Sequence, residues 1–124
     1  MTSDGSYHGI IVQESLRNPS VLDKFEVLGS AQGAHWTLYR VGVTKEAFPA
    51  MVDLVQRNLK VESGVPFYAH FYNREELVVV FPERIFHVTP KMSSWAPVLT
   101  YALSVGIPAE QLDFKPCRIE DETF

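Results

Sequence analysis

Four histidines are the first side chains of this sequence that could take part in chemistry, because imidazole titrates near neutral pH and is a common metal ligand. They are His8, His35, His70 and His87. No two of them have the spacing of an HxH, HExxH or related metal-binding motif, and Cys117 is the single cysteine of the chain. We therefore predict no metal site and no cofactor, and the neighbours of each histidine become the better guide.

His70 has the most informative neighbours. In the segment FYAHFY, apolar residues alternate with Tyr68, His70 and Tyr72. Alternate residues of a strand point to the same face, so these three side chains would place a titratable ring between two phenols. Aromatic rings with a few polar tips are the usual lining of a ligand pocket. The preferred interpretation is that His70 is a half-buried strand residue with a satisfied hydrogen bond. The alternative is a small-molecule site, and any such site is predicted to include this face, with His8 and Trp36 at its edge.

Length and composition describe the protein that must position these residues. A chain of 124 residues with 46% hydrophobic and 21% charged side chains is typical of one soluble domain, here with flexible ends expected at about 1–6 and 118–124. Lysine and arginine are scattered and the net charge is −4, which argues against nucleic-acid binding. No apolar run approaches the ~20 residues that span a bilayer, so no membrane association is predicted. The single cysteine and the polar N-terminal residues favour the cytoplasm.

The spacing of apolar residues and the positions of glycine, proline and capping residues predict the secondary structure. Gly9 lies in the first expected strand, where a glycine indicates close approach of another group. Asn18 is expected to cap a short helical turn that starts at Pro19. Pro49 is expected either to lie near the first turn of the next helix or to bend that helix. Strands are predicted over 7–14, 26–30, 36–43 and both arms of a hairpin at 65–88, and helices over 46–60 and 94–106.

This order of elements predicts an α+β fold, ferredoxin-like, with a mostly antiparallel βαββαβ sheet, an extra strand and a C-terminal helix. Such a sheet carries its helices on one face. The open face would then meet water, the terminal helix or a second subunit. A homodimer formed sheet to sheet is the leading expectation. The second arm of the 65–88 hairpin, LVVVFPERIFHV, is apolar on both faces and requires cover on both sides.

Five segments carry a resemblance to a known family. They are YHGIIVQESL, WTLYRV, FYAHFY, VVVFPERIF and YALSVGIPAEQLDF. Together they resemble a family of small uncharacterised bacterial and archaeal proteins. The resemblance covers most of the chain and implies one compact α+β domain. It implies no activity and no functional residue.

Two hypotheses about function follow. The first is a non-catalytic module that binds a small molecule or a protein and acts as a homodimer. The second is a small cofactor-free enzyme of the dimeric α+β barrel type, in which His70 is the general acid or base and Tyr68 or Tyr72 orients the substrate. The first is preferred because no partner for a catalytic imidazole can be named from the sequence. The relation of His8 to His70 depends on strand register, since a slip of one residue reverses every side chain.

Overall fold

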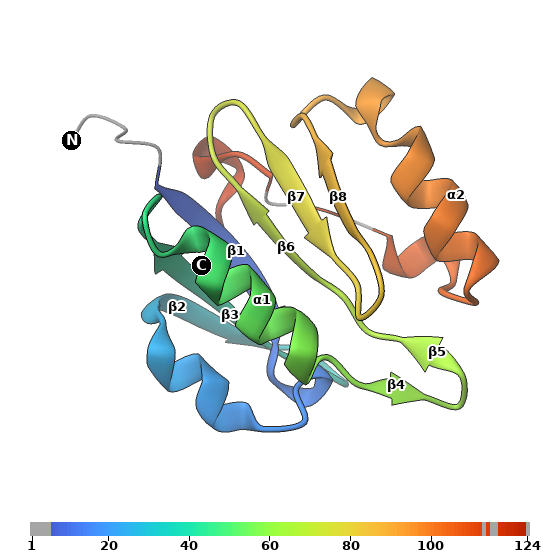
Figure 1. The fold of residues 1–124 in the computed structure, drawn as a ribbon, viewed down its shortest axis with the longest axis horizontal. Coiled ribbons are helices and arrows are strands. Elements are labelled where there is room, and N and C mark those ends of the chain that lie inside the picture. The colour runs from blue at the N-terminus through green and yellow to red at the C-terminus, as the bar shows by residue number, and fades with distance from the viewer. Residues whose placement is uncertain (1–5, 113, 115–116, 124) are drawn as a thin grey trace.

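An antiparallel sheet of six strands is the centre of the computed structural model, which describes residues 6–112, 114 and 117–123. The strands run in the order β2-β3-β1-β6-β7-β8, and every pairing among them is antiparallel (Figure 1). A separate two-stranded sheet, β4-β5, links α1 to β6. The bounds are β1 Tyr7–Val12, β2 Glu26–Gln32, β3 Thr37–Val43, α1 Phe48–Asn58, β4 Val61–Glu62, β5 Val65–Pro66, β6 Ala69–Tyr72, β7 Leu77–Val80, β8 Ile85–Val88 and α2 Ala96–Ser104.

Local signals in the sequence account for several of these elements. The side chain of Asn18 accepts a hydrogen bond from the backbone N–H of Ser20 (3.1 Å) and caps a 3₁₀ turn over Pro19–Lys24, which confirms the predicted turn. Pro49 lies in the first turn of α1, where its missing N–H leaves no hydrogen bond unmade. The predicted hairpin at 65–88 is divided further, because the backbone N–H of Phe81 donates to the carbonyl of Arg84 (2.7 Å) and turns the second arm back on itself.

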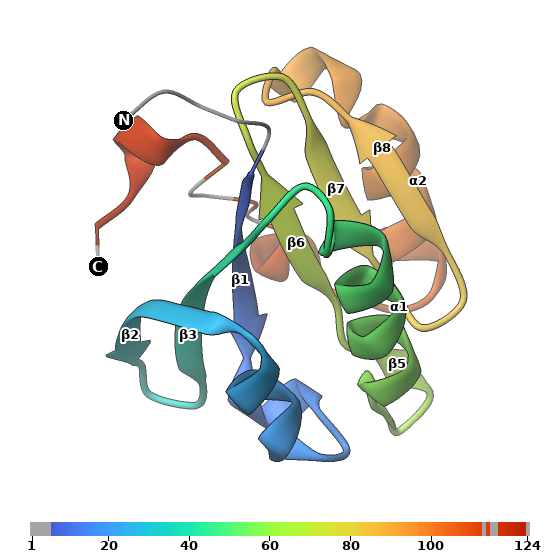
Figure 2. The same ribbon diagram turned by 60° about the vertical axis from the view of Figure 1, so that its left-hand side comes forward.

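The ferredoxin-like prediction is wrong. In the described residues three strands precede the first α-helix, and the segment between β1 and β2 contains 3₁₀ turns but no α-helix. The helices α1 and α2 lie on opposite faces of the sheet, whereas a ferredoxin-like sheet has both on one face (Figure 2). The physical reason lies in β7, whose four residues Leu77–Val80 are all fully buried. A strand that is apolar on both faces needs a covering layer on each side.

The described residues form two hydrophobic cores, one on each face of the sheet. The first lies under α1 and the Pro19–Lys24 turn and contains alternate strand residues such as Ile11, Phe71 and Val78. The second lies under α2 and contains the intervening residues Ile10, Tyr72 and Val79, together with Phe114 and Cys117 from the C-terminal part of the chain. On this second face α2 covers one side of the sheet, and of the predicted site residues His70 and Tyr72 lie on β6 and His8 lies on β1.

Candidate functional site

The pairing of β1 with β6 settles which predicted residues share a face. His8 lies opposite Tyr72, and Ile10 lies opposite His70. Directly paired residues of neighbouring strands project to the same side of a sheet, so His8, His70 and Tyr72 all lie on the face that carries α2. His8 and His70 are therefore on one face but are not directly paired.

A cavity of about 280 Å³ opens on this face beside the segment that follows α2. His70 is 3% exposed and lies against its floor, with Tyr68 beside it and Trp36, 37% exposed, at the rim. Three of the five residues predicted for a ligand site thus line one cavity. Its full lining is Ile10, Val12, Trp36, Leu38, Pro66, Phe67, Tyr68, His70, Ile107, Glu110 and Gln111.

Aromatic packing holds the walls of this cavity in place. The ring of Trp36 meets the ring of Phe67 edge to face, with centroids 5.4 Å apart. The hydroxyl of Tyr68 donates a hydrogen bond to the backbone carbonyl of Gln111. The imidazole of His70 lies 6.0 Å from the ring of Phe114, centroid to centroid. The cavity therefore offers a largely apolar surface with few polar groups, the composition typical of small-molecule sites.

The other two predicted residues, His8 and Tyr72, belong to an adjoining cluster around the carboxylate of Glu122. Nδ1 of His8 lies 2.5 Å from Oε2 of Glu122, and the hydroxyl of Tyr72 donates to the same oxygen. A guanidinium nitrogen of Arg40 lies 3.1 Å from Oε1. Burial raises the pKa of Tyr72 well above its usual range, and the hydrogen bond and charge of Glu122 raise it further. We refer to His8, Arg40 and Tyr72 with the carboxylate they hold as the Glu122 cluster.

Arg40 and Glu122 are the two site residues that sequence reasoning missed. Arg40 could have been found from the sequence. The alternation that places Leu38 on this face also places Arg40 there, and Arg40 lies opposite Ile10. Glu122 lies in the segment expected to be flexible, 114 residues from His8, and nothing local connects it to the sheet. One indication was available. Tyr72 is fully buried in a strand, and a buried hydroxyl needs a hydrogen-bond acceptor.

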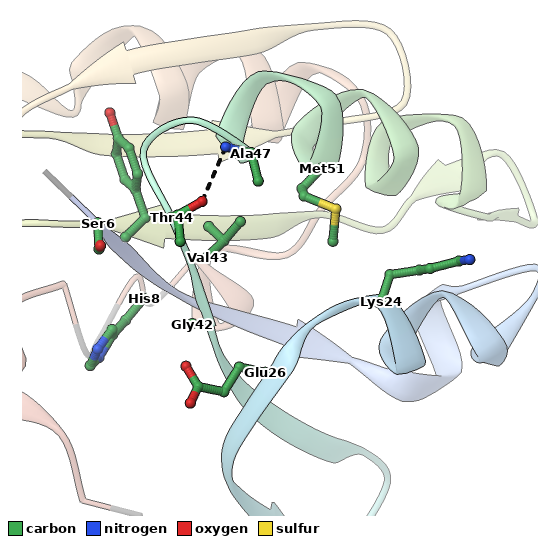
Figure 3. A pocket seen from close by; sticks show the side chains of 10 residues that line it. Ser6, His8, Lys24, Glu26, Gly42, Val43, Thr44, Ala47 and Met51 are labelled. Carbon is green, nitrogen blue, oxygen red and sulfur yellow. Dashed lines mark hydrogen bonds between the residues drawn. The ribbon is translucent and has the colours of Figure 1, made fainter.

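A second hollow, of about 420 Å³, lies at the start of β1 between α1 and the Pro19–Lys24 turn (Figure 3). It is larger and more open than the first. The charged ends of Lys24 and Glu26 point apart within it, and its one drawn hydrogen bond joins the backbone N–H of Ala47 to the hydroxyl of Thr44 (3.2 Å). The polar side chains of this hollow do not converge, so the first cavity is the stronger candidate site.

Metal ligands do not gather in the part of the chain that the structure describes. No three histidine, cysteine, aspartate or glutamate side chains there are grouped so that they could hold a metal ion. Within the same residues, every helix is too short or too polar to cross a membrane. Comparisons with protein-family models, with curated proteins and with solved structures give no match. The resemblance to a family of small uncharacterised proteins thus stays a prediction.

Proposed function

We propose that this protein is a non-catalytic module that binds a small molecule in the 280 Å³ cavity. The proposal rests on one observation: Tyr68, His70 and Trp36 line a single, largely apolar cavity. The cavity is close in size to the lower end of the range for ligand pockets, about 300 Å³. A buried imidazole and an anchored phenol supply the few polar contacts that orient a ligand.

Native mass spectrometry of the protein purified from cells tests this proposal. We expect wild-type protein to carry a bound small molecule, and His70→Phe to lose it, because phenylalanine keeps most of the ring volume but has neither nitrogen. His87→Phe is the matched control, since its side chain is 61% exposed and lies outside the cavity. Thermal unfolding of all three proteins measures stability. If His70→Phe retained the molecule, or lost stability without any change in binding, His70 would have a structural role only.

The alternative is an enzyme in which His70 is the general acid or base. Tyr68 and His70 line the same cavity, whereas the hydroxyl of Tyr72 donates to Glu122, so Tyr68 is the better candidate for orienting a substrate. Titration of His70 by NMR separates the two functions. A pKa strongly displaced from about 6.5, and displaced further when ligand is added, would favour the enzyme.

Two further proposals concern assembly and location. A homodimer would use the β1–β3 part of the second face, where α2 gives no cover and the ring of Trp36 is 37% exposed. A cytoplasmic location is supported by a sequence with one cysteine, Cys117, whose thiol is buried in the second core.

A further inference from the structure

Donors from three strands converge on one carboxylate, next to residues that line the proposed ligand cavity. His8 comes from β1, Arg40 from β3 and Tyr72 from β6, and each contacts an oxygen of Glu122. We propose that these three residues form a carboxylate-binding site and that Glu122 occupies it in place of a ligand. The ligand class is a small monocarboxylate with an apolar body. This inference rests on the proposed function, because the apolar body would lie in the cavity.

The position of the cluster relative to the cavity supports this ligand class. Ile10 lines the cavity and lies between Arg40 on β3 and His70 on β6. The ring centroids of His70 and Tyr72 are 6.1 Å apart. Three bonds of an extended chain span about 3.3–3.6 Å. A chain of roughly six to ten heavy atoms is therefore long enough to place a carboxylate at the Glu122 cluster and its apolar end in the cavity.

The chemistry of the cluster is suited to a carboxylate. Arg40 contacts one oxygen, while His8 and Tyr72 contact the other, so both oxygens are held. The side chains of Arg40 and Glu122 are only 15% and 12% exposed, and charge-assisted hydrogen bonds are stronger where water is largely excluded. A neutral ligand of the same shape would leave the guanidinium of Arg40 without this carboxylate, at an energetic cost.

In the described part of the segment that carries Glu122, the residues after Cys117 bury little apolar surface. Asp121 nevertheless lies 3.9 Å from the Cys117 thiol and accepts hydrogen bonds from Arg118. Cys117 anchors its start in the second core. Beyond Cys117, Ile119 is 55% exposed, and Glu120 and Thr123 are exposed as well. Because apolar burial is the main stabilising term, release of Glu122 would expose little core surface. Exchange of one carboxylate for another at the same donors is therefore a low-cost step.

Octanoate and 1-octanol are the probes that test the inference, because they share an apolar chain and only octanoate carries the charge. Each is titrated into the 124-residue protein and followed by ¹H–¹⁵N NMR. In wild-type protein we expect octanoate to bind more tightly than octanol and to move the amide signals of residues 119–123 towards unstructured values. Octanol should shift the cavity signals alone. This measurement needs no variant, so it stands even if a substitution in the cluster impairs folding.

Variants then identify the site. Glu122→Gln should bind octanoate about tenfold more tightly if Glu122 occupies the donors for roughly nine-tenths of the time. Glu120→Gln removes the same charge from an exposed position and should leave the affinity unchanged within about twofold. Arg40→Gln should remove the preference for octanoate over octanol.

The outcomes separate this inference from the proposed function. If both probes bind in the cavity with equal affinity and the signals of residues 119–123 stay in place, the carboxylate site is refuted and the binding module stands. Binding of octanol alone would likewise refute the carboxylate site and leave the binding module in place. If neither probe binds, the inference of a monocarboxylate with an apolar body is refuted, and the binding module is then judged by native mass spectrometry alone.

Discussion

Gly9→Ala should destabilise the protein, because the ring of Phe71 fills the space that an added methyl group would need. The two residues are directly paired between β1 and β6. A Cβ atom built on Gly9 would lie 2.3 Å from Cδ1 and 2.6 Å from Cε1 of Phe71. Phe71 is fully buried. Its ring also packs against the rings of Phe25 and Phe48, whose centroids are 6.1 and 5.5 Å away. The ring therefore has no open space into which it can turn.

The magnitude follows from two opposing effects. Overpacking a well-filled core costs about 1–3 kcal/mol, and contacts this short place Gly9→Ala near the upper end, at about 3 kcal/mol. Alanine also lowers the conformational entropy of the unfolded chain, which stabilises the folded protein by roughly 0.4–1 kcal/mol. We expect a net loss of about 2 kcal/mol in the free energy of unfolding. Equilibrium unfolding in urea, followed by far-UV circular dichroism, measures it as a lower midpoint.

Gly33→Ala is the matched control. Its added Cβ would lie 3.5 Å from the carbonyl oxygen of Trp36, an ordinary contact, so the change in stability should stay within about 0.5 kcal/mol. Phe71→Leu provides a second check, because a smaller side chain opposite Gly9 should accommodate the methyl group. The double variant should then be more stable than the sum of the single effects predicts, by about 1 kcal/mol or more. A Gly9→Ala protein as stable as Gly33→Ala would refute the reasoning.

Two further predictions concern pH and assembly. Burial, followed by the hydrogen bond to Glu76, raises the pKa of Tyr7 to about 12, so its stabilising effect is complete below the unfolded pKa of about 10 and is lost as pH rises from there through 12. Between these values the wild-type unfolding free energy should fall more steeply than that of Tyr7→Phe, and equal slopes would contradict the assignment. Light scattering at micromolar concentration should report a dimer for wild-type protein and a monomer for Trp36→Lys, whereas a monomeric wild-type protein would count against association through this face.

The candidate site could be predicted in part because strand alternation is a local property. The pattern around His70 was enough to place Tyr68, His70 and Tyr72 on one face, and the cavity is lined by the first two of them. The same reasoning could not find Glu122, because its contact with His8 joins residues 114 positions apart. Nothing in the acidic segment RIEDETF distinguishes a residue bound to the sheet from one in solvent.

What the sequence alone determined is therefore local. The cap at Asn18, the proline in the first turn of α1 and the two-sided burial of Leu77–Val80 follow from the conformational limits and transfer energies of single residues and their neighbours. Only the tertiary structure decided which strands are adjacent, which helix covers which face, and which carboxylate reaches Arg40. These choices depend on the packing of both cores at once, and a one-dimensional pattern of apolar residues is compatible with several such arrangements.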